Sequence, residues 1–314
     1  MDKVKQTCIF IFSLLLMLSL CSCASSGTSK DTTVIKQAST KEDDFNSSIR
    51  KSFVVDGDFK TTIKLCTQEI AINPTNSHAY MVRAISYEAE KQYSEALSDL
   101  SKAIELDSDK HIFYHHRARI YKINGKYEMA LADYDKTIHL FPKETPDNDQ
   151  NGLAINYFHR ALLYYRAFVD YDKALEDLHR VIELDPNAAT AYVAIGSIHN
   201  DCQRYDMALD YLNEGLRLAP DSPMALYVRG LVYIRLNKTQ NALDDFSAIV
   251  KKDERNYHGW FGRTIVFCIL GFKEPAYKKF MEYVPESEQE MINTARENID
   301  NMVERAYWEV PPLF

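Results

Sequence analysis

The sequence predicts an all-α protein made of tandem helix–turn–helix units. Its 314 residues include only ten glycines and ten prolines, which favours helices over a turn-rich β architecture. An alanine also recurs in the same sequence context along the chain. Successive alanines are separated by the same number of residues, except for one longer interval. A fixed period of this kind is the signature of a repeat architecture. The alanines are Ala96, Ala130, Ala174, Ala208, Ala242 and Ala276.

Each alanine lies in the predicted second helix of a unit. Stretches such as YSEALSDLSKAIELDSD and YDKALEDLHRVIELDPN place a tyrosine three residues before the alanine, where the helix opens. Apolar residues then recur every three or four positions, which is helical periodicity. Pro142, Pro186 and Pro220 follow three of these patterns and end the helix, because proline cannot continue one.

A predicted first helix precedes each second helix and carries one small residue at its middle. A large residue stands four positions before the small one, and an aromatic residue usually stands three positions after it. Small residues where two helices cross let the axes approach closely, and the large residues fill the space between them. The six small residues are Ala84, Ala118, Ala161, Gly196, Gly230 and Thr264.

Together these features resemble the tetratricopeptide repeat, a helix–turn–helix unit of about 34 residues. The resemblance implies a right-handed superhelical α-solenoid of about seven units over residues 43–285, with a C-terminal capping helix. The pattern weakens at both ends. Arg50 and Thr62 stand where the first unit should have small residues, and Pro275 lies early in the last second helix. Such departures are typical of terminal units, which have fewer neighbours.

The longer step from Ala130 to Ala174 predicts an interruption between the third and fourth units. The polar stretch KETPDNDQNGL supplies most of the extra length, and the insertion is predicted near 143–153. One further residue is expected at the turn inside the fourth unit, in RAFVDYDKA. The insertion is either a polar surface loop or a hinge or contact loop that divides the array, and the sequence leaves both open.

Residues 286–314 are predicted to form a capping helix and a tail. Ser287 and Glu290 have the spacing of a capping box, which starts a helix. An apolar stripe follows and should cover the exposed end of the seventh unit. The stripe consists of Met291, Ile292, Ala295, Ile299 and Met302.

The segment 1–22 is predicted to be a signal peptide. Lys3 and Lys5 precede an apolar run over residues 9–20. As a helix this run would reach roughly 18 Å, which is short of the ~30 Å hydrocarbon core of a membrane. A charged start, a short apolar stretch and small residues after it are typical of a secretory signal.

The stretch LCSC at the end of that run resembles a bacterial lipobox. Cys23 has Leu20 three positions before it and the small Ser22 directly before it, so the resemblance implies lipid attachment, such as palmitate, at Cys23. An ordinary signal peptide with an incidental cysteine is the alternative. Residues 23–42 are rich in Ser, Thr, Lys and Asp, which predicts a flexible tether. The expected location is the bacterial cell envelope, extracytoplasmic and lipid-anchored. If the organism has two membranes, Ala24 after the cysteine resembles the outer-membrane sorting pattern.

The sequence offers no motif for catalysis. It lacks a Gly-rich phosphate loop, an H-E-x-x-H motif and a G-x-S-x-G motif, so we expect no enzyme and no cofactor. The formal net charge of −8 argues against a nucleic-acid partner. Imidazole groups bind metals, and His111, His115 and His116 lie close together, with His159 in the next unit. However, no Asp, Glu or Cys joins them at ligand spacing. The three cysteines after the tether, Cys66, Cys202 and Cys268, are predicted to be small buried hydrophobes.

The resemblance also implies where a ligand would bind, because the first helices of such repeats line a concave groove. The groove positions are predicted to be aromatic and locally basic, with Glu88 and Asp201 as the main acidic exceptions. This composition suits an extended or helical peptide with acidic groups or a free C-terminus. The alternative is that the same aromatic residues only pack between units. The candidate groove residues are His115, Arg119, Lys122, Phe158, Tyr165, Arg166, Tyr227, Leu231, Arg235 and Phe261.

The sequence therefore predicts a membrane-anchored, extracytoplasmic scaffold that binds other proteins in its groove. Two alternatives from other classes stay open at this point. One is a self-associating structural envelope protein that stacks through its terminal units. The other is a metal-dependent protein that uses the region from His111 to His116.

Overall fold

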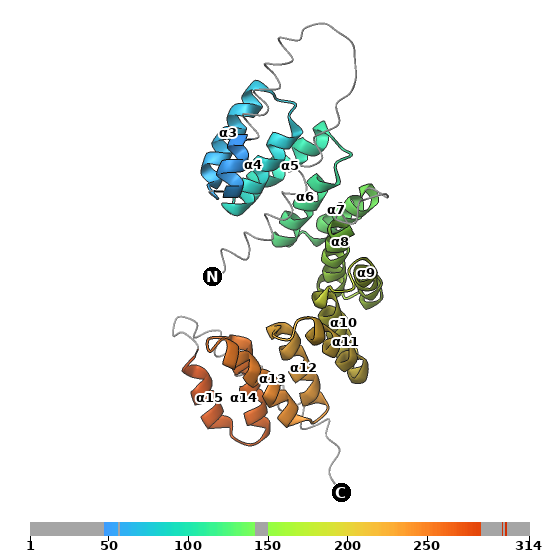
Figure 1. Ribbon diagram of the computed structural model, residues 1–314, viewed down its shortest axis with the longest axis vertical. Coiled ribbons are helices and arrows are strands. Elements are labelled where there is room, and N and C mark those ends of the chain that lie inside the picture. The colour runs from blue at the N-terminus through green and yellow to red at the C-terminus, as the bar shows by residue number, and fades with distance from the viewer. Residues whose placement is uncertain (1–46, 56, 142–149, 284–296, 298, 300–314) are drawn as a thin grey trace. The chain divides into compact units, whose positions relative to one another are not determined.

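The computed structural model describes residues 47–55, 57–141, 150–283, 297 and 299 (Figure 1). These ranges contain helices and turns, and no strand occurs in them. The chain divides into two compact units, Met1–Leu163 and Tyr164–Phe314. We describe each unit by itself.

The first unit consists of helices that follow one another and pack in sequence order. Within the described ranges the elements are η1 (Arg50–Val55), α3 (Phe59–Ile72), α4 (Ser77–Ala89), α5 (Tyr93–Leu106), α6 (His111–Ile123), α7 (Tyr127–Leu140) and α8 (Gln150–Leu163).

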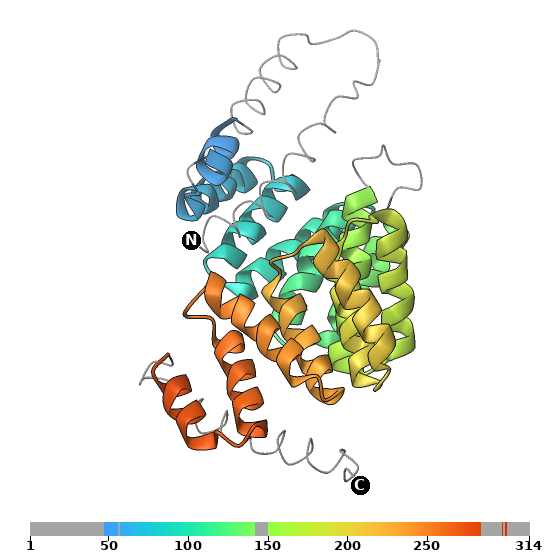
Figure 2. The same ribbon diagram turned by 60° about the horizontal axis from the view of Figure 1, so that its bottom comes forward.

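The second unit continues the same alternation, and Figure 2 shows consecutive helices running side by side as hairpins. Its described elements are η2 (Tyr164–Phe168), α9 (Tyr171–Leu184), α10 (Ala189–Asp201), α11 (Tyr205–Leu218), α12 (Pro223–Arg235), α13 (Thr239–Lys252), α14 (Tyr257–Ile269) and α15 (Lys273–Met281). The all-α tandem fold predicted from the sequence is confirmed.

The turn inside each hairpin has the same backbone geometry. One residue per turn adopts a left-handed conformation with φ between 55° and 89°. These residues recur along the chain with the same steps as the alanines of the second helices. The described residues thus contain seven hairpin turns in one register. The seven residues are Gly57, Lys91, Gly125, Val169, Gln203, Asn237 and Gly271.

The small residues lie where the repeat pattern requires close contact. All six predicted small residues of the first helices are buried, and so are the six alanines of the second helices. In the hairpins that lie within one unit, a large apolar residue of the second helix fills the remaining space, and Leu178 of α9 is the equivalent residue in the fourth repeat. Leu100, Tyr134, Leu178, Leu212, Phe246 and Phe280 are all fully buried.

The structure describes the end of the interruption between the third and fourth units. Helix α8 begins at Gln150, so residues 150–153 of the predicted insertion are helical and extend this first helix by about one turn; residues 142–149 lie outside the described residues. The one extra residue expected in the stretch RAFVDYDKA is accommodated by η2, a π-helical turn that includes the first residues of this stretch. A π turn accommodates one more residue than an α turn, so the turn at Val169 keeps its usual geometry.

Several predicted segments lie outside the described residues: the signal peptide 1–22, Cys23, the tether 23–42 and most of the cap 286–314. Of the predicted apolar stripe, Ile299 is described, and it is fully buried in the apolar cluster of the second unit. Cys66 and Cys268 are buried as expected, whereas Cys202 ends α10 and is partly exposed. In the part of the chain that is described, no helix has the length and apolar character needed to span a membrane.

Candidate functional site

The candidate groove residues all come from first helices, or from η2 that extends one, and they fall into two sets. The first unit holds His115, Arg119 and Lys122 on α6 and Phe158 on α8. The second unit holds Tyr165 and Arg166 on η2, Tyr227, Leu231 and Arg235 on α12, and Phe261 on α14.

On α6, Arg119 is bound to an acidic residue of the neighbouring first helix. Its Nη2 donates to Oε1 of Glu88 on α4 at 2.9 Å, and the Glu88 side chain is only 6 % exposed. Burial raises the pKa of Glu88, while the nearby charges of Arg119 and Lys122 partly oppose that shift. One of the two acidic groove residues thus neutralises a predicted groove arginine, and this part of the face is less basic than the sequence suggested.

His115 links two first helices. Its Nδ1–H donates to Oδ1 of Asn156 on α8 at 2.7 Å. Burial, followed by the charge of Arg119, lowers the pKa of His115 to about 4, so the ring is neutral near pH 7. The His115 side chain therefore connects two neighbouring repeats, and its Nδ1 is not available to a partner protein.

His115 belongs to a largely buried aromatic cluster whose histidines the sequence analysis considered for metal binding. Its ring centroid lies 5.3 Å from that of His116, 6.3 Å from Tyr134 and 6.1 Å from His159. Burial holds the pKa values of His116 and His159 well below the usual range. Both ring nitrogens of His116 are buried without a hydrogen-bond partner. Across the described ranges, no three His, Cys, Asp or Glu side chains are placed to hold a metal ion.

In the second unit, Tyr165 binds the other acidic groove residue. Its hydroxyl donates to Oδ2 of Asp201 on α10 at 2.6 Å. Burial first, and then this hydrogen bond, raise the pKa of Tyr165 above its usual value. The adjacent Arg166 is exposed.

Helix α12 presents a stripe of partly exposed side chains, each one helical turn after the last: Tyr227, Leu231 and Arg235. The ring of Tyr227 lies 5.0 Å from that of the exposed His258 on α14. Phe261 behaves differently, since it is 8 % exposed and stacks on Tyr257 with centroids 5.6 Å apart. Phe261 therefore fits the alternative given in the sequence analysis, in which the aromatic residue packs between units and does not line an open groove.

Sequence reasoning missed a repeated ion pair between the two helices of a hairpin. In three repeats, an arginine of the first helix donates through Nε and Nη2 to both carboxylate oxygens of an aspartate on the second helix, at 2.7–2.9 Å. We call these pairs the Arg–Asp ladder. Its described pairs are Arg83–Asp99, Arg117–Asp133 and Arg229–Asp245.

Each ladder arginine makes two further contacts. Its Nη1 donates to a polar side chain on the preceding second helix: Thr67, Ser101 or Asn213. Its guanidinium also lies over one or two aromatic rings of its own helix: Arg83 lies over Tyr80 and Tyr87 at 5.6 and 5.9 Å, and Arg229 lies over Tyr233. The ladder thus ties each hairpin to the preceding one.

With this geometry established, comparison with known proteins identifies the family. Models described as tetratricopeptide repeat match residues 77–110, 112–144, 159–223 and 201–258. Together these ranges cover more than half of the chain. The chain belongs to the tetratricopeptide-repeat family, whose repeats mediate contacts between proteins.

Individual relatives are distant. Anaphase-promoting complex subunit 3 of Schizosaccharomyces pombe is 24 % identical over 218 residues, which is 69 % of this chain and 31 % of that protein. The Hsp70-Hsp90 organizing protein of Triticum aestivum is 22 % identical over 242 residues, which is 68 % of this chain and 42 % of that protein. The chain therefore spans less than half the length of these two relatives.

Among solved structures, a tetratricopeptide repeat protein from Parabacteroides merdae superposes with a TM-score of 0.64. The match covers 81 % of this chain and 98 % of that one, at 19 % sequence identity. At this level of identity the likeness shows a common fold.

Proposed function

We propose that the protein is a lipid-anchored, extracytoplasmic adaptor that binds segments of other proteins along its first helices and has no catalysis of its own. The family supports binding to proteins, and two of its distant relatives are named for the assemblies they serve: a subunit of the anaphase-promoting complex and an organizer of two chaperones.

The stripe of Tyr227, Leu231 and Arg235 on α12 is the observation that carries this proposal. These three residues stay partly exposed, whereas Phe261 and Ile265 at the equivalent positions of α14 are 8 % and 0 % exposed. A partly exposed aromatic, an aliphatic and a cationic side chain in one row supply contact area and charge at low entropic cost. This row is the part of the candidate groove best suited to a partner.

The charges of Arg235 in the row and of Arg166 on η2 favour an acidic segment or a free C-terminus. Arg235 and Arg166 each carry a guanidinium, and a planar guanidinium matches a carboxylate bidentately. In the first unit Arg119 is already occupied by Glu88. Because Arg166 is exposed, we place recognition of a carboxylate in the second unit, at Arg166.

Anchoring would raise the effective concentration of the groove near a membrane. Cys23 follows the apolar run 9–20, and the polar stretch 23–42 separates it from the first helices. A tether of this composition lets the folded part search a shallow layer above the membrane, where even weak contacts with partners become significant.

Photocrosslinking in the native membrane tests the binding face. A photoreactive amino acid placed at Leu231 should capture the same protein in every preparation. Placed at the exposed Asp210 on the second helix α11, it should not capture that protein. Arg166→Glu combined with Tyr227→Ala should abolish the crosslink at Leu231, while Arg255→Glu in an exposed turn should preserve it. An equal yield from both crosslinker positions would refute the proposed face.

Lipid attachment has a separate test. Metabolic labelling with palmitate should mark the wild-type chain and the Cys21→Ser variant, but not the Cys23→Ser variant, and only the last should leave the membrane fraction. Label on the Cys23→Ser variant would contradict the anchor and leave the binding face unaffected.

A further inference from the structure

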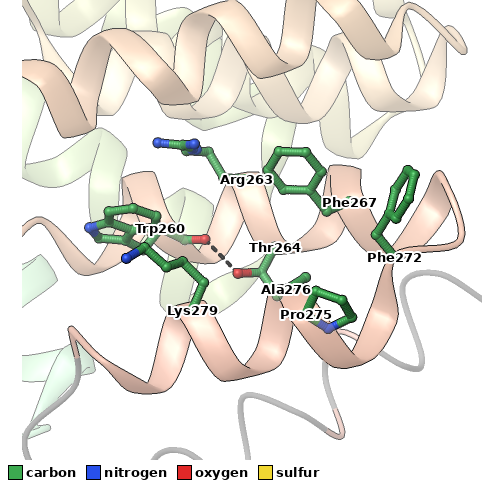
Figure 3. A pocket seen from close by; sticks show the side chains of 8 residues that line it. All are labelled: Trp260, Arg263, Thr264, Phe267, Phe272, Pro275, Ala276 and Lys279. Carbon is green, nitrogen blue, oxygen red and sulfur yellow. Dashed lines mark hydrogen bonds between the residues drawn. The ribbon is translucent and has the colours of Figure 1, made fainter.

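A cavity of about 320 Å³ lies between α14 and α15 in the seventh hairpin (Figure 3). Trp260, Arg263 and Phe267 line it from α14, and Pro275 and Lys279 line it from α15, with Phe272 at its outer edge. Arg263 is two residues from Phe261 and hence roughly 200° around the helix from it. The cavity is therefore separate from the first-helix face proposed above.

The cavity occupies the place of a ladder pair. Arg263 stands one repeat period after the ladder arginine Arg229, and Lys279 stands one repeat period after its partner Asp245. Arg263 keeps the aromatic setting of a ladder arginine, with its guanidinium 4.7 Å from the Trp260 ring and 6.0 Å from the Phe267 ring. In this hairpin, however, a lysine replaces the aspartate that should bind it.

Arg263 is consequently left without a carboxylate. Within residues 150–283 it forms no ion pair, and its Nε is buried without a hydrogen-bond partner. Lys279 is turned to Glu282, with 2.5 Å between Nζ and Oε2. A buried donor with no acceptor destabilises a fold, so a carboxylate that reached Arg263 would be bound favourably.

We infer that this cavity binds the carboxylate of an Asp or Glu from a partner protein, together with an apolar side chain next to it in the partner's sequence. The three complete ladder pairs define the expected contact, in which Nε and Nη2 donate to both carboxylate oxygens.

The apolar neighbour is expected to pack against Phe267, Phe272 and Pro275. Phe272 is 59 % exposed, so its ring is available for such a contact. Arg263 and Lys279 make this cavity locally cationic although the chain is net acidic, and its lining suits an acidic residue beside an apolar one.

The test uses the purified full chain in mild detergent with ¹⁵N-labelled tryptophan. The chain has two tryptophans, so the indole N–H signal of Trp260 is assigned from the Trp308→Phe variant. The probe is the dipeptide N-acetyl-Phe-Asp-amide, and its matched control is N-acetyl-Phe-Asn-amide, which has the same shape without the charge. The Asp peptide should shift the Trp260 signal saturably and bind at least about tenfold more tightly than the Asn peptide, because it makes charge-assisted hydrogen bonds.

Two variants assign the effect to the ladder position. Arg263→Gln should remove the preference for the Asp peptide without loss of helical circular dichroism, since Arg263 has no ion pair to break. Lys279→Asp should restore the missing ladder pair, and should therefore raise the unfolding temperature and block the Asp peptide. Arg229→Gln serves as the control: it should lower stability but keep the peptide preference.

Equal binding of the two peptides, or an unchanged preference in Arg263→Gln, would overturn the inference. So would a full chain that gives no response while a chain ending at Tyr283 responds, because residues 284–314 of the chain itself would then occupy the cavity. None of these results depends on whether the α12 stripe binds a partner.

Discussion

The guanidinium of Arg229 and the carboxylate of Asp245 form a bidentate ion pair, with Nε to Oδ2 at 2.9 Å and Nη2 to Oδ1 at 2.7 Å. The two side chains are only 22 % and 7 % exposed. Breaking such a pair leaves one buried charge uncompensated, whereas replacing both partners by packed apolar residues is often nearly neutral. The fifth repeat already shows the replacement, because Ile195 and Tyr211 occupy the corresponding positions.

We therefore predict that Asp245→Ala lowers the free energy of unfolding by about 2–4 kcal/mol, since Arg229 loses its acceptor. The double variant Arg229→Ile with Asp245→Tyr, which copies the fifth repeat, should lose clearly less. Urea unfolding followed by circular dichroism measures both. Equal losses in the single and the double variant would show that the pair is not the source of the stability.

A second prediction concerns acid stability of the first unit. His115 has a pKa of about 4 in the folded state, against about 6.5 in an unfolded chain, because burial opposes its charge. Between about pH 6.5 and about pH 4, His115 is protonated in the unfolded chain but stays neutral in the folded chain. The free energy of unfolding should thus fall as pH drops from about 6.5 to about 4, by roughly 3 kcal/mol for His115 alone.

His116 and His159 should add to this loss, because burial also lowers their pKa values. His159→Phe keeps a ring stacked on Tyr134 and removes one titrating group, so its stability should depend less on pH than that of the wild type. Tyr134→Phe is the matched control, because it alters the same cluster but removes no group that titrates between about pH 5 and about pH 7.5: burial raises the pKa of Tyr134. Denaturant titrations at about pH 7.5 and about pH 5 supply the comparison.

The repeat register could be predicted from the sequence because it depends on residue size alone. Ala96 and the alanines equivalent to it mark positions where only a small side chain fits, whatever the partner. The Arg–Asp ladder was missed for a physical reason. Arg83 and Asp99 lie on different helices, and their separation along the chain has meaning only once the faces of both helices are known.

The sequence predicted which positions lie on the groove face, but it did not predict which of their side chains bind each other. Arg119 and Glu88 were each placed on the groove face, and their contact at 2.9 Å depends on how α4 and α6 pack. Tyr165 and Asp201 are a second case of the same kind. The net basicity of a repeat surface therefore cannot be read from its charged positions one at a time.

A third prediction concerns the ring of Phe246, which lies against two glycines of successive first helices. A Cβ added at Gly230 would lie 2.6 Å from the ring, and one added at Gly262 would lie 2.3 Å from it. Gly262→Ala should overpack this core and lower the free energy of unfolding by about 1–3 kcal/mol.

Combining Gly262→Ala with Phe246→Leu should recover part of that loss, because the smaller side chain makes room for the new methyl group. Thermal unfolding of the two single variants and the double variant tests this. Losses that simply add would mean that the two positions do not share the same space.

The last prediction concerns the backbone at Val169, which has φ of 55° in the turn after η2 and is 62 % exposed. A left-handed conformation strains a β-branched residue, and asparagine tolerates it better; the equivalent turn already has Asn237 at φ 56°. Val169→Asn should therefore raise the free energy of unfolding by about 1 kcal/mol, since little packing is lost. The reverse change, Gly125→Val at φ 70°, should lower it by about 1–2 kcal/mol although no atom lies within 4 Å of the added Cβ. Guanidinium unfolding of both variants measures the two effects. If neither variant changes stability, the shared left-handed turn does not select the residue that occupies it.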